Sequence, residues 1–426
     1  MKPDLALFGG PKTRPRAFPP HPLIGEEEKR AVLEVLERGQ LSTFIAAPGP
    51  CFLGGEKIRQ FEQQFAVFHG VAHAVAFNSA TAALHAAVVA AGVQPGEEVI
   101  VPPYTFTSTA TCVLMHNAIP VFADIEDETY GLDPAAAERA VSARTRAIIP
   151  VHLFGHPARM DEIMQLARRH RLKIIEDCAQ APGAMYKGRL VGTIGACGVF
   201  SFTESKTITT GEGGMLITDD PAIAEAARLV RNHGEVISED QTERTYSSTL
   251  LGWNYRMTEM EAALGIVQFG RLPALNAQRI ALARHLSERL QALRGLSAPV
   301  VRPGCTHVYY AYPIAYDEQV VGVARDDFAK AVAAEGVPVG TGYVRPLYLS
   351  PIYHEQRPPA FRLYDGDARY EQGLCPVAEA MHERRVLLLG IVRPPASLAD
   401  MDDVVTAFTK VYERRDELVR TAERVR

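Results

Sequence analysis

The chain has 426 residues and a mass of 46.6 kDa, which is long for one hydrophobic core and predicts two domains, or one large α/β domain with a smaller partner. Hydrophobic residues make up 47% and charged residues 22%, so a disordered chain and a small disulfide-stapled module are both excluded. The formal net charge is −5, without a block of like charge. This argues against a nucleic-acid or anionic-membrane surface and favours a small-molecule partner.

The six cysteines are far apart and include no Cys-x-x-Cys pair, so we expect reduced thiols rather than a disulfide framework. The N-terminus has no apolar signal segment, and no later stretch is as long and apolar as a membrane span. The sequence therefore predicts a cytoplasmic protein.

From about residue 61, short apolar segments alternate with helical patterns, as in a doubly wound α/β domain. Residues 71–78 are strand-like and lead into an Ala- and Leu-rich helix that ends at Gly92. Six further apolar segments mostly lack alternation, which is typical of strands covered on both faces; they lie in 97–106, 119–125, 147–155, 173–181, 198–202 and 213–220. We predict a mixed, mostly parallel central sheet.

After Asp220 the pattern becomes helical, with a helix over 221–234, a polar interruption over 235–248 and a long helical stretch over 257–295. Pro273 is expected to kink or divide this last helix, which is long enough to connect two domains. We place the boundary there: 1–265 forms the N-terminal segment and large domain, and 266–426 forms a smaller α+β domain. The smaller part has an expected strand at 307–317, helices at 326–337 and 401–418, and a Pro- and Tyr-rich loop at 342–353 that we expect to face a ligand.

The first candidate site segment is 199–215, where Lys206 stands among Ser, Thr and Gly residues. Exposed backbone N–H groups and hydroxyls suit a phosphate, and a desolvated lysine amine suits a Schiff base. A surface turn with a solvated lysine fits the same residues.

The second segment is the apolar strand 173–177, which ends in Glu176 and Asp177. Ligands of open α/β sheets bind outside the carboxyl ends of the strands, where an acid could pair with a pyridine nitrogen. A helix N-cap is the alternative role for the aspartate.

The third segment is a strand-to-helix turn that contains Asn78, Ser79, Ala80 and Thr81. The free N–H groups of the first helical turn could bind an anion, or the turn could be an ordinary capped helix.

Other chemistries find little support in the sequence. His69 and His73 are four residues apart but lack the glutamate of a zincin motif, no Cys/His cluster has structural-zinc spacing, and we predict no metal site. The chain has neither a P-loop nor a dinucleotide fingerprint, and no serine stands in a Gly-x-Ser-x-Gly setting.

Taken together, the three segments occur in the order found in fold type I pyridoxal-phosphate (PLP) enzymes. The chain resembles the DegT-type family of PLP-dependent sugar aminotransferases over nearly its whole length, and the resemblance rests on seven motifs. They are NSATAALHAA, VPPYTFTSTA, PVHLFGHPARMD, IIEDCAQA, SFTESKTITTGEGGM, RNHGE and GWNYRMTEMEAALG. It implies an α/β fold with a large domain on a mostly parallel sheet and a smaller C-terminal domain.

The resemblance also implies roles for individual residues. Lys206 would bind PLP covalently and move the α-proton of the amino donor, Asp177 would pair with the pyridinium nitrogen, and Gln180 would hydrogen-bond the phenolic oxygen. The remaining positions are Phe106, which would stack on the ring, Ala80, Thr81 and Ser201, which would hold the phosphate, and Asn254, which would reach the phosphate of the neighbouring subunit in a homodimer. The family usually has Gly at position 80 and Ala at position 178, where this chain has Ala80 and Cys178.

The resemblance implies transfer of an amino group from L-glutamate or L-glutamine to the ketone of a keto-sugar or keto-cyclitol. Aminotransfer to a nucleotide-linked keto-sugar and a PLP-dependent dehydration or aromatisation, as in an aminohydroxybenzoate synthase, are the alternatives. His156, Arg231, Tyr343 and Arg345 are candidate substrate-binding residues, and a structural role is the alternative for each. Arg231, Arg256 and Arg345 could each bind the donor carboxylate.

Overall fold

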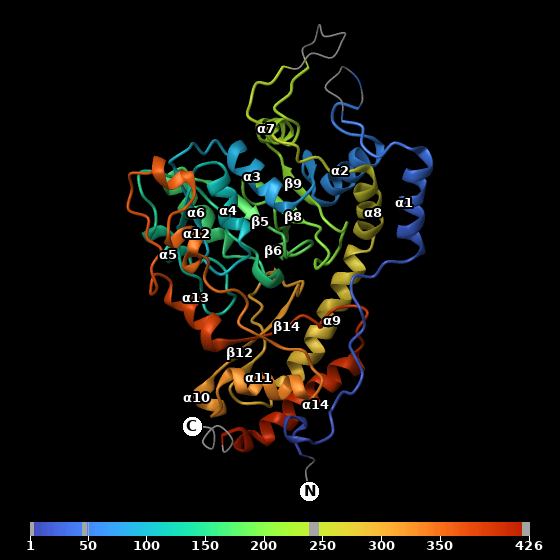
Figure 1. The fold of residues 1–426 in the computed structure, drawn as a ribbon, viewed down its shortest axis with the longest axis vertical. Coiled ribbons are helices and arrows are strands. Elements are labelled where there is room, and N and C mark those ends of the chain that lie inside the picture. Colours follow the sequence, from blue (N-terminus) through green and yellow to red (C-terminus); the bar gives the residue numbers. More distant parts are fainter. Residues whose placement is uncertain (1–3, 45–48, 50, 238–246, 420–426) are drawn as a thin grey trace.

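A computed structural model describes residues 4–44, 49, 51–237 and 247–419. Its larger body is built on a seven-stranded sheet in the order β1-β9-β8-β5-β4-β2-β3 (Figure 1). The strands are β1 (His73–Phe77), β2 (Glu98–Val101), β3 (Ile119–Phe122), β4 (Thr145–Ile148), β5 (Lys173–Asp177), β8 (Cys197–Ser201) and β9 (Gly214–Thr218). The pairs among β3, β2, β4, β5 and β8 are parallel, and β9 runs antiparallel between β8 and β1. The prediction of a mixed, mostly parallel sheet is confirmed.

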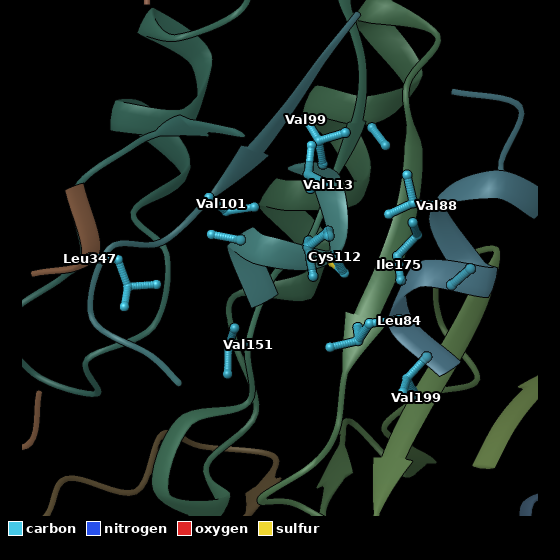
Figure 2. Packing of buried hydrophobic residues seen from close by; sticks show 14 of the residues in the cluster. Leu84, Val88, Val99, Val101, Cys112, Val113, Val151, Ile175, Val199 and Leu347 are labelled. Atoms are coloured by element: carbon cyan, nitrogen blue, oxygen red, sulfur yellow. The ribbon is translucent and has the colours of Figure 1, made fainter. Parts of the chain in front are cut away.

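Helices cover both faces of this sheet. Neighbouring residues of a strand point to opposite faces, and here both faces carry apolar side chains that must be buried. Ile175 belongs to a core cluster with α3 and α4, whereas Ile174 belongs to a separate cluster with α5 and α6. Figure 2 shows Leu84, Val88, Cys112 and Val113 from the first helical layer gathered over the sheet. The helices of the large body are α1 (Glu26–Arg38), α2 (Glu56–His69), α3 (Ala80–Ala90), α4 (Ser108–Met115), α5 (Pro134–Arg139), α6 (Met160–His170), α7 (Pro221–Arg231) and α8 (Glu259–Gly270).

The helical stretch after α8 breaks at Arg271 and continues as α9 (Leu272–Leu290), with Pro273 in its first turn. The predicted division of this helix at Pro273 is therefore confirmed. Figure 1 shows α9 running from the large body to the smaller one.

The smaller body has a four-stranded sheet in the order β10-β12-β14-β13, which α9, α11 and α14 cover with one apolar cluster. Its elements are β10 (Leu296–Ser297), β12 (Tyr312–Tyr316), α10 (Glu318–Val321), α11 (Arg325–Ala334), β13 (Gly340–Thr341), α13 (Pro376–Ala380), β14 (Val386–Leu389) and α14 (Leu398–Glu413). A three-stranded sheet of β6 (Met185–Tyr186), β7 (Arg189–Leu190) and β11 (Cys305–Thr306) joins the two halves of the chain. The predicted loop 342–353 contains the 3-10 turn Leu347–Leu349 and the start of α12 (Pro351–His354).

Residues on each side of the predicted boundary at position 265 pack into the body formed mainly by the other side. Leu5 lies in the apolar cluster of the smaller body, and Arg14 forms an ion pair of 2.8 Å with Asp400. Conversely, Leu347 and Tyr353 are buried in the cluster of the large sheet. Most of the predicted polar interruption, residues 238–246, lies outside the described residues. None of the helices in the described ranges is long and apolar enough to cross a membrane.

Candidate active site

Lys206 lies in the loop after β8, and only 8% of its surface is exposed. Its Nζ stands 4.4 Å from the ring centre of Tyr310, which belongs to the segment before β12. Backbone contacts hold the loop: the Lys206 N–H donates to the Thr203 carbonyl at 2.9 Å, and the Lys206 carbonyl lies 3.1 Å from Nε2 of His21. The amine is thus held inside the protein, which excludes the surface-turn interpretation of this segment.

Asp177 ends β5 at the edge of the sheet where the parallel strands finish. Its carboxylate accepts hydrogen bonds from the Thr109 hydroxyl at 2.8 Å and the Ala179 N–H at 3.1 Å. Among the described residues, no basic side chain lies within ion-pair distance of it. Burial raises the pKa of Asp177, although these two hydrogen bonds and the charge of Lys206 act in the opposite direction. A cationic ligand would stabilise the ionised carboxylate and lower its pKa again.

Glu176 points to the other face of β5 and has a structural environment. It is fully buried, and its carboxylate accepts from the backbone N–H groups of Gly192 at 2.8 Å, Ile194 at 2.7 Å and Gly195 at 2.6 Å. Nε2 of His152 lies 3.0 Å from the same carboxylate. These hydrogen bonds hold the pKa of Glu176 below its usual value even though burial raises it.

The buried Cys178 lies near His152 and Glu176. One potential metal-ligand atom from each of these three residues lies within 4.8 Å of the other two. The carboxylate already accepts four hydrogen bonds, and burial raises the pKa of the Cys178 thiol well above its usual value. A neutral thiol is a poor metal ligand, so we assign the cluster a structural role.

The turn where β1 meets α3, called the cradle below, is a candidate site for an anion. The Ser79 hydroxyl accepts from the Ala82 N–H at 3.1 Å, and the Ser79 carbonyl accepts from the Ala83 N–H. The N–H groups of Ala80 and Thr81 precede the helical hydrogen-bond ladder and are available to a ligand.

Ser201, at the end of β8, lies beside this cradle through β9. Gly214 pairs with Phe77 on one side and Ser201 on the other. A Cβ on Gly214 would stand 2.6 Å from the Ala80 nitrogen. The absence of a side chain at 214 therefore lets the β9 backbone approach the start of α3 closely, which brings the Ser201 strand end beside the cradle.

Gln180 and Tyr343 form one polar unit across the two bodies. Gln180 accepts from the Phe154 N–H at 2.7 Å and donates to the Tyr343 hydroxyl at 2.9 Å. Burial raises the pKa of Tyr343, so the hydroxyl keeps its proton and can donate it to a ligand oxygen. Phe106, in the loop after β2, is 57% exposed.

Asn254 is an exposed residue next to the cradle. Its backbone carbonyl lies 3.5 Å from Nδ2 of Asn78, while its side chain has no hydrogen-bond partner among the described residues. The side chain is therefore free to meet another molecule.

Two of the four candidate substrate residues are engaged elsewhere. Arg231 is 1% exposed; its guanidinium pairs with Glu62 at 2.6 Å and donates to the Ala76 carbonyl at 3.0 Å. These contacts give it a structural role, so we leave it out of the site.

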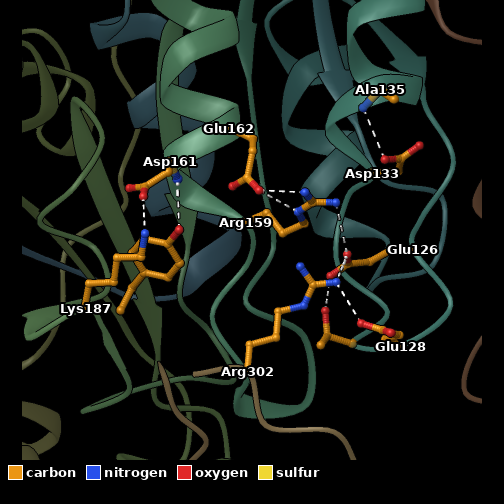
Figure 3. Close-up of polar contacts among 11 residues, drawn as sticks. Glu126, Glu128, Asp133, Ala135, Arg159, Asp161, Glu162, Lys187 and Arg302 are labelled. Carbon is orange, nitrogen blue, oxygen red and sulfur yellow. Dashed lines mark hydrogen bonds and ion pairs between the residues drawn. The ribbon is translucent and has the colours of Figure 1, made fainter. Parts of the chain in front are cut away.

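His156 is also structural. Its Nδ1 lies 2.8 Å from the Pro157 carbonyl, and its Nε2 accepts from the Arg302 N–H at 3.2 Å. Burial lowers the pKa of His156 to about 4, which keeps the ring neutral. Figure 3 shows how the side chain of Arg302 in turn contacts Glu126 and Glu128, so this corner is closed by ion pairs.

The sequence profile of the DegT/DnrJ/EryC1/StrS aminotransferase family matches residues 22–409. The chain belongs to this family. It is thus an aminotransferase, and its fold is the fold type I architecture expected from the sequence.

Three relatives illustrate the range of the family. The L-glutamine:scyllo-inosose aminotransferase of Streptomyces griseus is 37% identical over 99% of this chain and 100% of its own. The GDP-perosamine synthase of Caulobacter vibrioides is 37% identical over 80% of this chain and 87% of its own. Among solved structures, 3-amino-5-hydroxybenzoic acid (AHBA) synthase superposes with a TM-score of 0.81 at 28% identity, over 93% of this chain and 99% of the other.

Several residues of this candidate site were not found from the sequence. Thr109 contacts Asp177, and Tyr310 and His21 contact Lys206, the last two from segments with no motif of their own. The signal was present only for Thr109, which lies four residues after Thr105 in the conspicuous stretch VPPYTFTSTA.

Proposed function

We propose that this protein is a PLP-dependent enzyme that transfers an amino group from L-glutamine or L-glutamate to the ketone of a keto-cyclitol or keto-sugar. The observation that carries the proposal is a buried carboxyl group, Asp177, which forms no ion pair with a described residue, at the same sheet edge as a buried amine, Lys206. A protonated pyridine would supply the missing cation, and an aldehyde would use the amine.

The remaining residues fit the other parts of PLP. The N–H groups of Ala80 and Thr81 and the Ser201 hydroxyl would hold a phosphate at the positive end of α3. The open ring of Phe106 would stack on the pyridine, and the Gln180–Tyr343 unit would bond the phenolic oxygen.

When bound, PLP supplies an electron sink that makes the α-proton of an amino acid removable. Asp177 would hold a proton at the pyridine nitrogen, and Thr109 and Ala179 would fix the direction of its carboxylate. Lys206 would take the α-proton and return it to the neighbouring carbon. The buried surroundings of these groups would exclude water from both transfers.

A keto-cyclitol acceptor with L-glutamine as donor is the preferred substrate pair. The S. griseus relative that covers essentially the whole chain is named for L-glutamine and scyllo-inosose. A nucleotide-linked keto-sugar is the second candidate, since a GDP-perosamine synthase is as similar over a shorter stretch.

We further propose a homodimer whose two sites are shared. The exposed Asn254 side chain, which forms no hydrogen bond with a described residue, supports this arrangement. The exposed apolar residues Leu33 and Leu36 on α1 and the neighbouring Leu41 support it as well. Reduced cysteines fit a cytoplasmic enzyme, which remains our prediction for its location.

The test is the absorption spectrum of the protein with PLP, recorded before and after L-glutamine and, separately, L-glutamate. We expect the visible band of the lysine-bound cofactor to be replaced by the spectrum of pyridoxamine phosphate. Subsequent addition of scyllo-inosose should restore the visible band, whereas a nucleotide-linked keto-sugar that restores it instead would favour the second candidate. A band that neither donor removes would contradict the proposal.

A further inference from the structure

The ring of Tyr310 lies over the amine of Lys206. Its centre is 4.4 Å from Nζ, and the Tyr310 hydroxyl lies 3.3 Å from the hydroxyl of Ser205, the residue before Lys206. An aromatic ring attracts a cation through the negative charge on its face, and the attraction is strongest where water is excluded. Lys206 is buried, so this contact lies in such a place.

The described chain offers the Lys206 amine no other direct partner. Its Nζ forms no hydrogen bond and no ion pair with a described residue. The charge of Asp177 acts on it from beyond ion-pair distance, and in the proposed function the pyridine nitrogen uses that charge. Because a buried cation is costly without compensation, the ring of Tyr310 is the contact that supports the amine when it is charged.

The backbone that carries Tyr310 is held in a strained conformation. Tyr309 has a φ of 49°, in the left-handed region that bulky residues rarely adopt. Its ring stacks on His307, with ring centres 3.9 Å apart, and its carbonyl accepts from Nη1 of Arg279 at 3.0 Å. Strained residues of this kind persist only where the surrounding contacts fix them, and they are common at functional sites.

A second strained turn packs against this one. Phe154 has a φ of 56°, and a Cβ on Gly155 would stand 3.0 Å from the backbone nitrogens of Tyr309 and Tyr310. The N–H of Phe154 donates to Gln180 at 2.7 Å. The two turns therefore meet at their backbones and fix the places of Tyr310 and Gln180 in the candidate site.

We propose that Tyr310 is a positioning residue for Lys206, whose ring holds the amine while the amine carries the α-proton of the amino donor. In that step the neutral amine takes the proton, the electron pair of the C–H bond stays behind, and Lys206 is a cation until it returns the proton to the neighbouring carbon. The ring face lowers the free energy of the cationic amine relative to the neutral one. This inference rests on the proposed function and assigns a residue to its proton transfers.

The test compares two reactions of the same amine in Tyr310→Leu. Proton transfer passes through the charged amine, so L-glutamine should remove the visible band about 3- to 30-fold more slowly than in the wild type. Deuterium at the α-carbon of L-glutamine should slow this variant at least as much as it slows the wild type. Capture of PLP by the apoprotein consumes the neutral amine, so the visible band should form at least as fast as in the wild type.

Two further variants and one background separate the role of the ring from packing. Tyr310→Phe keeps the ring and should react with L-glutamine within about twofold of the wild type. Tyr186→Leu is the matched control, because Tyr186 is a partly buried tyrosine whose ring centre lies 5.5 Å from Nζ of Lys187, outside the candidate site. It should keep the wild-type rates of both reactions. In a Lys206→Ala background, Tyr310→Leu should leave the affinity for PLP unchanged, because the amine that the ring holds is gone.

If Tyr310→Leu slows both reactions alike, reacts with L-glutamine at the wild-type rate, or weakens PLP binding in the Lys206→Ala background, the assignment is wrong although the proposed function stands. If neither L-glutamine nor L-glutamate reacts with the wild-type protein, the proposed function fails and the assignment fails with it.

Discussion

Nε2 of His21 lies 3.1 Å from the carbonyl oxygen of Lys206, so the N-terminal segment holds the loop that carries the proposed catalytic amine. Burial and the charge of Arg393 lower the pKa of His21 to about 4, which keeps its ring neutral at pH 7. A neutral ring that donates from Nε2 has an acceptor at Nδ1, so its tautomer is fixed. His21 is therefore a positioning residue for Lys206.

His21→Ala should slow the half-reaction with L-glutamine about 5- to 10-fold, because a net hydrogen bond of about 1 kcal/mol no longer holds the loop. We expect kcat to fall while KM for the donor changes little, since the lost contact is to the backbone of the lysine loop. His21→Gln can donate to the same carbonyl and should recover part of the rate. An unchanged kcat in His21→Ala would show that the contact does not position the amine.

Glu176 and Asp177 are adjacent, but removal of their charges should affect different properties of the protein. Asp177→Asn should reduce the half-reaction rate by at least 100-fold, because an amide cannot stabilise a charged pyridine nitrogen. Glu176→Gln should lower the melting temperature, because a buried acceptor of several N–H bonds is weakened. Single-turnover rates and thermal unfolding of the two variants, measured side by side, check both statements.

Asp177 should also affect the stability of the protein without cofactor. The folded pKa of Asp177 is raised, so its ionisation destabilises the apoprotein as the pH rises above the usual range of an aspartate. Asp177→Asn should therefore be at least as stable as the wild type at pH 7 when PLP is absent, and lose this advantage when PLP is added. A strongly destabilised Asp177→Asn apoprotein would mean that the carboxylate is structural.

The sequence predicted the sheet, the divided helix 257–295 and the segments that converge on the site, because these follow from local periodicity and strand order. Local pattern alone did not separate Glu176 from Asp177, since which face a strand residue occupies depends on the packed helices; the family resemblance singled out Asp177. Nor could local pattern show that Arg231 pairs with Glu62, which is far away in sequence.

Acidification should destabilise the protein through its buried histidines. Burial lowers the pKa of His69 to about 4, against a usual value of about 6.5. Between these two values the unfolded chain binds a proton that the folded chain does not, so the free energy of unfolding falls as the pH falls, by about 1.4 kcal/mol per unit for one such histidine. Denaturant unfolding from pH 6.5 to 4 should show a shallower fall in His69→Phe than in the wild type, while His170→Gln, which removes an exposed histidine of α6, should not change the slope.

Gly214→Ala should weaken PLP binding. The new methyl group would stand 2.5 Å from the Ser79 carbonyl carbon and 2.6 Å from the Ala80 nitrogen, so the start of α3 must move away from β9. Overpacking of this kind costs about 1–3 kcal/mol, which corresponds to a rise of about 5- to 150-fold in the dissociation constant of PLP if the cradle takes the strain. The control is Gly270→Ala, where nothing lies within 4 Å of the added carbon. Equal PLP affinity in both variants would place the phosphate elsewhere.

Subunit mixing tests whether the sites are shared. Lys206→Ala should bind PLP without the covalent link and be inactive, and Asn254→Ala should lose affinity for PLP because the neighbouring phosphate loses a hydrogen bond. If each site combines Lys206 of one protomer with Asn254 of the other, a mixed dimer contains one intact site and one site with both defects. Random exchange then restores about a quarter of the wild-type activity per protomer. If both residues serve the same site within one chain, each site of the mixed dimer carries one defect, and no activity returns beyond that of the two variants assayed separately.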